Sequence, residues 1–159
     1  MNKTDKNFMN EALKEAKKAM KNEEVPIGAV VVKNGKVIAR SFNNREEKQN
    51  AVNHAELLAI SKACKKEKSW RLDNATLYVT LEPCLMCAGA ALNARISKVV
   101  FGAYDNTSSL RNLVTGCDEK IEKYEISSLN HKTFFVHDEN DESCKQLLQD
   151  FFADKRKKI

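Results

Sequence analysis

Proline and glycine are scarce in this chain, with 2 and 5 residues among 159. This composition leaves no low-complexity hinge, so we expect residues 1–159 to form a single domain with one core. Long apolar runs are also missing, which excludes a membrane-spanning helix. The first twenty residues lack such a run and hold acidic side chains, which argues against a secretory signal and a transit peptide.

Cysteine is present without a disulfide pattern, since the count is odd, at five, and the spacing matches no framework. A second Cys-x-x-Cys pair, which a closed structural zinc site would need, is absent. We therefore expect a cytoplasmic protein, with Cys64 and Cys144 packed in the core and no assignment for Cys117. The net charge of +5 suits a polyanionic partner but is also common in Lys-rich soluble proteins.

Two short motifs carry candidate chemistry: His54-Ala55-Glu56 and Pro83-Cys84-Leu85-Met86-Cys87. One imidazole and two thiolates suffice for a catalytic zinc, which keeps its fourth position for water. If Cys84 begins a helix, both thiolates point from one turn to the same ion, and Pro83 fits just before the start. The positive helix N-terminus and the metal both favour the thiolate form.

The spacing of His54 and Glu56 cannot place both side chains on one helix face. At a helix start it lets His54 reach the metal while Glu56 reaches the neighbouring water and moves protons. Each motif alone also fits a solvated helix start, a structural zinc site or a redox pair. Together they predict one zinc per chain, bound by His54, Cys84 and Cys87, with Glu56 as the catalytic residue.

The rest of the chain alternates helical and strand patterns. Apolar periodicity predicts helices at 8–20, 57–64 and 144–152. Runs rich in β-formers predict strands at 27–32, 37–42, 76–80, 99–101 and 133–136. Asn34-Gly35 predicts a hairpin between the first two strands. The expected fold class is α/β, with helices packed on a mixed sheet, and both motifs begin helices.

The chain resembles the bacterial tRNA-specific adenosine deaminases of the cytidine-deaminase-like superfamily. His-x-Glu with Pro-Cys-x-x-Cys is the signature of the zinc deaminases. The resemblance covers nearly the full length and is most specific in TLEPCLMCAGA and in the terminal Asp150-Phe151-Phe152. It also runs through residues 24–30, 53–56, 70–72, 95–96, 99–103 and 130–131.

The resemblance implies a three-layer α/β/α sandwich with a five-stranded mixed sheet, a homodimer, and conversion of the wobble adenosine of an arginine tRNA to inosine. Glu56 would take a proton from water and return it to N1 and then to the ammonia leaving C6. Asn43 matches a substrate-binding Asn, although Asn43-Asn44 is also typical of a turn. Val25, Pro26 and Ile27 match the pocket wall, or simply pack in the core.

A tRNA anticodon stem-loop would be the partner, because its loop bases are unpaired and cheap to extrude. Phe151 and Phe152 are adjacent, so one can face the core while the other meets RNA. Lys155 and Arg156 suit phosphates, or else belong to a solvated tail. The resemblance thus predicts RNA contacts for Phe152, Lys155 and Arg156.

The chain departs from the family pattern after Ala103. Asp105 is in place, but Thr107 replaces a Lys, and Ser108-Ser109-Leu110 replaces a glycine-rich turn. The segment up to Asn130 is longer than expected and holds acidic residues that suit phosphates poorly: Asp118, Glu119, Glu122 and Glu125. This segment is either a surface excursion or a change to the pocket entrance.

Three functions remain open at this point. The first is a tRNA adenosine deaminase, and the second is a small-molecule nucleobase or nucleoside deaminase of guanine or cytosine type. The third is a non-enzymatic, zinc-stabilised RNA-binding protein. Glu56 argues against the third, since a structural metal site has no use for it, and the terminal Phe-Phe and basic run argue against the second.

Overall fold

The computed structural model describes residues 3–107, 110–116, 119–128, 130–138 and 142–158. Ser108, Ser109, Cys117 and Asp118 therefore lie outside the described residues. The elements are α1 (Lys3–Lys21), β1 (Gly28–Lys33), β2 (Lys36–Phe42), α2 (Arg45–Lys48), α3 (Ala55–Glu67), β3 (Thr76–Leu81), α4 (Leu85–Asn93), β4 (Lys98–Ala103), α5 (Leu110–Thr115), β5 (Lys123–Ser128), β6 (His131–His137) and α6 (Glu142–Lys157). Among the described helices, none has the length and apolar character needed to cross a membrane.

The strands form one mixed sheet in the order β2-β1-β3-β4-β6-β5. β1 is antiparallel to both β2 and β3, the strands β3, β4 and β6 run parallel, and β5 is antiparallel to β6. The predicted hairpin between β1 and β2 is confirmed, with positive φ angles of 52° at Asn34 and 73° at Gly35. Two such angles in succession are what a tight two-residue hairpin turn requires.

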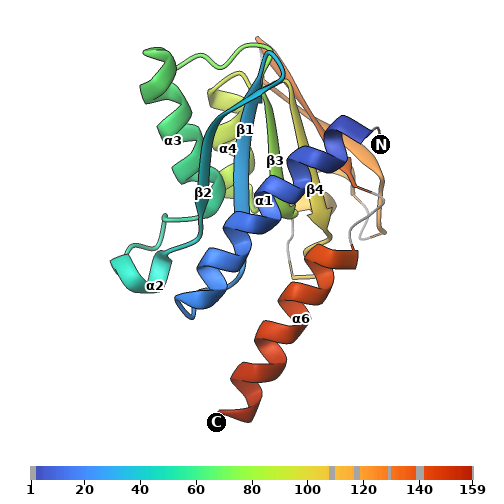
Figure 1. Ribbon diagram of the computed structural model, residues 1–159. Coiled ribbons are helices and arrows are strands. Elements are labelled where there is room, and N and C mark those ends of the chain that lie inside the picture. Colours follow the sequence, from blue (N-terminus) through green and yellow to red (C-terminus); the bar gives the residue numbers. More distant parts are fainter. Residues whose placement is uncertain (1–2, 108–109, 117–118, 129, 139–141, 159) are drawn as a thin grey trace.

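Helices cover both faces of the sheet, with α1 and α6 on the near face and α3 and α4 on the far face in Figure 1. Successive side chains of a strand point to opposite faces. Accordingly, Ala29 and Val31 pack in the cluster with α3 and α4, whereas Val30 and Val32 pack in the cluster with α1. The predicted three-layer α/β/α architecture is confirmed.

Two glycines allow the near-face helices to lie directly on the strands. A Cβ atom at Gly28 would collide with the backbone of Ala12 and Ala16 in α1. At Gly102 in β4, it would collide with Cys144 of α6. Cys144 is buried in this contact, as predicted for a core cysteine.

The predicted strand number was wrong, because the sheet has six strands and not five. The additional strand is β5, at the sheet edge, within the segment that departs from the family pattern. Tyr124 is buried and Ile126 is half-buried, whereas Lys123 and Glu125 are exposed. This alternation is typical of a strand with one solvated face, and the acidic side chains of the segment obscured it. The helices α2 and α5 were also not predicted, because each is too short to show apolar periodicity.

The topology brings several chain segments together at one end of the sheet. β3 and β4 end there in parallel register, with Leu81 opposite Ala103. β1 begins and β2 ends at this same end of the sheet, with Gly28 opposite Phe42. The carboxyl ends of parallel strands are the usual place for a ligand in α/β sheets.

Candidate active site

The two predicted motifs begin α3 and α4, as expected. His54 is the N-cap of α3 and Cys84 is the N-cap of α4, both with extended backbone. Cys87 lies in the first turn of α4, and Pro83 directly precedes the cap. The start of each helix therefore presents its ligand at the same end of the sheet.

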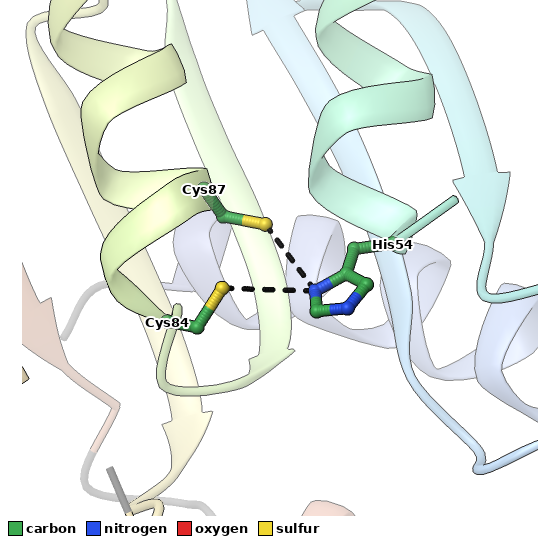
Figure 2. A group of neighbouring side chains, drawn as sticks. All are labelled: His54, Cys84 and Cys87. Carbon is green, nitrogen blue, oxygen red and sulfur yellow. Dashed lines mark hydrogen bonds between the residues drawn. The ribbon is translucent and has the colours of Figure 1, made fainter. Parts of the chain in front are cut away.

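Figure 2 shows the imidazole of His54 facing the two thiols of α4. The Nδ1 atom of His54 lies 3.7 Å from Sγ of Cys84 and 3.6 Å from Sγ of Cys87. The three candidate ligand atoms lie within 4.8 Å of one another. A tetrahedral zinc with usual Zn–S and Zn–N bond lengths separates sulfur and nitrogen by about 3.5 Å. The residues therefore fit a metal ion with an open fourth position.

The charges of this cluster favour metal binding. Hydrogen bonding from Cys87, together with the neighbouring His54, lowers the pKa of Cys84 to about 4. Hydrogen bonding to Cys84 and burial raise the pKa of Cys87. The pKa of His54 is raised, mainly by its hydrogen bond with Cys84. The Cys84 thiolate is thus stabilised by the protons on Cys87 and His54, and a metal cation can take the place of those protons.

Glu56 lies beside this cluster and is not one of the three candidate metal ligands. The thiol of Cys87 donates a hydrogen bond to Oε2 of Glu56 at 3.1 Å. Glu56 is buried, and this burial raises the pKa of its carboxyl group. A carboxyl group with a raised pKa next to a metal position is suited to accepting and donating protons.

A cavity of about 280 Å³ opens over Glu56 and the metal ligands. Its wall includes Val25, Ile27 and Asn43, three of the predicted substrate residues. Pro26 is buried and is not part of this wall. A cavity of this size is near the lower end of those that hold small ligands.

Asn43 is held by local hydrogen bonds in the cavity wall. Its Nδ2 donates to the carbonyl of Val25 at 3.2 Å, and its Oδ1 accepts from the backbone N–H of Arg45 at 3.2 Å. The second bond is the turn expected from an Asn at this point. An amide has two donor hydrogens and two acceptor lone pairs, so one of each remains for a ligand.

Sequence reasoning missed several residues of the cavity wall. Arg45 was not named, and Leu81 and Glu82 were included only as part of the motif TLEPCLMCAGA. Asp105, which fits the family pattern, and Thr107, which departs from it, line the same cavity. An acidic residue that directly follows an apolar strand and precedes a metal motif, as Glu82 does, is a signal that would have identified one of them.

The terminal helix α6 lines a groove of about 630 Å³ next to the catalytic cavity, here called the α6 groove. Phe152 and Lys155 line this groove together with Val25, Asn43 and Arg45, which also line the catalytic cavity. In Figure 1, α6 extends past the ends of β3 and β4.

The two phenylalanines of α6 differ in exposure. Phe151 is 7% exposed and Phe152 is 45% exposed, so one faces the core and the other faces solvent, as the sequence predicted. Arg156 and Phe152 line a further cavity of about 330 Å³ that also contains Lys120 and Lys145.

Comparisons with known proteins identify the family of this chain. The MafB19-like deaminase family matches residues 3–156. A tRNA-specific adenosine deaminase of Bacillus subtilis (strain 168) is 48% identical over 158 residues, which cover 97% of this chain and 92% of that protein. The chain belongs to the tRNA-specific adenosine deaminase family.

Solved structures extend the comparison to the fold of this deaminase. A structure from a study of A-to-I editing by tRNA:A34 deaminases is 36% identical, with a TM-score of 0.76, and covers 90% of this chain and 99% of that chain. A guanine deaminase from Bacillus subtilis is 31% identical, with a TM-score of 0.61, and covers 82% of this chain and 88% of that chain. The deaminase is therefore similar to enzymes of both RNA and free-base type.

Proposed function

We propose that this deaminase converts the wobble adenosine of a tRNA anticodon to inosine, and that an arginine tRNA is the substrate. The observation that carries the proposal is the position of Glu56 beside His54, Cys84 and Cys87 in a cavity that adjoins the α6 groove. The similarity to tRNA-specific adenosine deaminases supplies the substrate class. The overall reaction consumes one water and releases one ammonia.

His54, Cys84 and Cys87 would hold one zinc ion per chain. When bound, zinc supplies Lewis acidity that makes a water molecule acidic near neutral pH. The donor set itself fits this ion, because one imidazole nitrogen and two sulfurs lie at separations suited to a tetrahedron.

Glu56 acts as the proton carrier of the reaction. Its carboxylate accepts a proton from the attacking water and delivers it to N1 of the adenine as oxygen adds to C6. The second proton of the water passes through the same group to the amino nitrogen, and ammonia leaves C6. Burial of Glu56 keeps bulk water away from these transfers.

The cavity wall orients the extruded base. Asn43 keeps one donor and one acceptor for the nucleoside, since its other groups are fixed by Val25 and Arg45. Val25 and Ile27 give the wall an apolar surface suited to a flat base. An unpaired loop base enters such a cavity at lower cost than a base inside a duplex.

The surfaces next to the cavity would bind the rest of the anticodon loop. Phe152 stands between the α6 groove and the cavity that contains Lys120, Lys145 and Arg156. No carboxylate is found among the described residues that line the latter cavity, so it suits phosphates. On the groove side, where Glu23, Glu24, Glu46 and Glu47 also line the wall, Lys155 would contact RNA, and the exposed ring of Phe152 provides a stacking surface.

We also infer a homodimer and a cytoplasmic location, and we propose that residues 1–159 act as one domain. Leu85 and Met86 are 56% and 37% exposed at the start of α4, and Val52 is exposed just before His54. Exposed apolar residues that gather around an active site are typical of an interface. Cys64 lies outside the metal cluster and forms no disulfide, which suits a reducing compartment.

The proposal is tested by assaying the purified protein against an arginine anticodon stem-loop and against free adenosine, guanine and cytosine. We expect inosine in the stem-loop and almost no reaction of free adenosine, because contacts to the flanking nucleotides contribute to alignment. A stem-loop with guanosine at the wobble position serves as the matched control. Efficient deamination of a free base, with no inosine in the stem-loop, would assign the protein to small-molecule deaminases instead.

A further inference from the structure

Glu82 is a buried carboxylate that the proton transfers above do not use. It lies between β3 and Cys84, its side chain is fully buried, and it lines the catalytic cavity. A buried carboxylate needs charged or hydrogen-bonding partners, since removing it from water carries a large cost.

The partners of Glu82 come from the segment that departs from the family pattern. Arg111 of α5 donates from Nε to Oε2 and from Nη2 to Oε1 of Glu82, both at 3.2 Å. The hydroxyl of Tyr124 in β5 donates to Oε2 at 2.7 Å. The additional strand and the short helix therefore fix a residue of the catalytic motif.

Arg111 is itself held in place by further contacts. Its Nη1 donates to the carbonyl of Glu119 at 3.0 Å, and its guanidinium lies 5.0 Å from the ring centroid of Tyr104. The ring of Tyr104 stacks on His137 with a centroid separation of 4.1 Å. Arg111 thus offers Glu82 a fixed fork of donors, a geometry that a flexible lysine would not reproduce.

Glu82 also connects this network to the edge of the catalytic cavity. The backbone N–H of Asp105 donates to Oε1 of Glu82 at 3.2 Å. Asp105 in turn accepts from the backbone N–H of Thr107 at 2.9 Å and from its hydroxyl at 2.7 Å. Residues 105 and 107 both line the cavity, and we call residues 105–107 the cavity rim.

We propose that Arg111 and Tyr124 are positioning residues of this active site, which act through Glu82 to fix the cavity rim against the extruded base. The proposal rests on the proposed function. Neither side chain reaches the reacting atoms, so their effect is on the alignment of the base with Glu56. A small misplacement of a bound reactant lowers the rate strongly while binding changes less.

The first test compares Tyr124→Phe and Arg111→Met with the wild type on the anticodon stem-loop. Tyr124→Phe removes the hydroxyl and keeps the ring, which stacks on Phe135 at 5.2 Å. We expect kcat to fall about tenfold to a hundredfold in both variants, with a smaller change in KM and unchanged zinc content. Arg111→Lys should recover part of the loss, because it restores the charge without the fork.

Tyr78→Phe is the matched control. Tyr78 also loses a hydrogen bond to a carboxylate, that of Asp5, but it lies in the cluster on the opposite face of the sheet. This variant should keep the wild-type kcat. If Tyr78→Phe lowered kcat as much as Tyr124→Phe, the loss in both variants would reflect reduced stability, and the proposal would be overturned.

The second test follows hydrogen–deuterium exchange of the Asp105 amide, which needs no substrate. We expect faster exchange in Tyr124→Phe and Arg111→Met and no change in Tyr78→Phe. Unchanged exchange at Asp105, or faster exchange with an unchanged kcat, would overturn the proposal. Absence of inosine with the wild-type protein would instead refute the proposed function, and kcat would then be compared on the free base that the wild type deaminates.

Discussion

Glu56 combines burial with a position next to three metal-ligating side chains. We expect Glu56→Gln to keep the fold and the metal, because the amide has the same shape and removes a buried charge. Turnover should fall by at least about a hundredfold to ten-thousandfold, since an amide cannot carry protons. Inosine formation and zinc content measure the two effects.

Glu67→Gln, near the other end of the same helix, is the control for Glu56→Gln and should be fully active. Substantial activity of zinc-loaded Glu56→Gln would remove Glu56 from the mechanism.

The two thiols of α4 supply two of the three metal-ligand atoms from a single helical turn. The double variant Cys84→Ser, Cys87→Ser should lose zinc and melt at a lower temperature, because a ligand bound only to the folded state stabilises it. At a thousandfold excess over its Kd, that contribution is about 4 kcal/mol. Metal analysis and thermal unfolding with and without a chelator test this.

Cys64→Ser is the control for the double variant, since Cys64 is half-buried in the core and outside the cluster. It should retain zinc. Full zinc occupancy in the double variant would show that the metal assignment is wrong.

At the scale of elements, α6 has one face for the core, where Phe151 is buried, and another on which Phe152 is exposed, the face proposed to contact RNA. Phe151→Ala should lower the free energy of unfolding by about 3 kcal/mol, as for a buried aromatic residue. Phe152→Ala should change stability little but weaken stem-loop binding by about 1–3 kcal/mol, the usual effect of a lost base stack. Urea unfolding and stem-loop titration separate the two, and equal effects on both quantities would contradict the division of α6 into two faces.

The basic end of α6 should affect the salt dependence of RNA binding. Replacing Lys155 and Arg156 with Ala should make the slope of log K against log salt shallower by about 1.4, or 0.7 for each phosphate contacted. The measurement is stem-loop affinity over a series of salt concentrations. Lys65→Ala with Lys66→Ala, at the far end of α3, removes the same charge as a control, and an equal change there would indicate a non-specific charge effect.

At the scale of the whole molecule, the proposed dimer would bury the exposed apolar residues at the start of α4. Leu85→Glu with Met86→Glu should convert the proposed dimer to a monomer, since buried unpaired charges at an interface are costly. Sedimentation velocity measures the change. Leu113→Glu, at the exposed end of α5, is the control and should remain dimeric, whereas a monomeric wild type would contradict the inferred dimer.

Much of the fold could be predicted because local patterns determine it. The dipeptide Asn34-Gly35 readily adopts the positive φ angles that a two-residue hairpin turn requires, and the structure has them. His54 and Cys84 each begin a helix, and the spacing from Cys84 to Cys87 places both thiols in one turn. Propensity, spacing and apolar periodicity act over a few residues, so the sequence reports them directly.

The tertiary structure alone decided how the distant segments meet. Arg111 and Tyr124 are 29 and 42 residues from Glu82, and no local pattern encodes their contact. It arises because β5 pairs with the edge of the sheet, which places Tyr124 beside Glu82. From the sequence, the acidic residues of this segment allowed the interpretation that it is a surface excursion. The cavity wall likewise forms only because the strand order places the start of β1 and the ends of β2, β3 and β4 at the same end of the sheet.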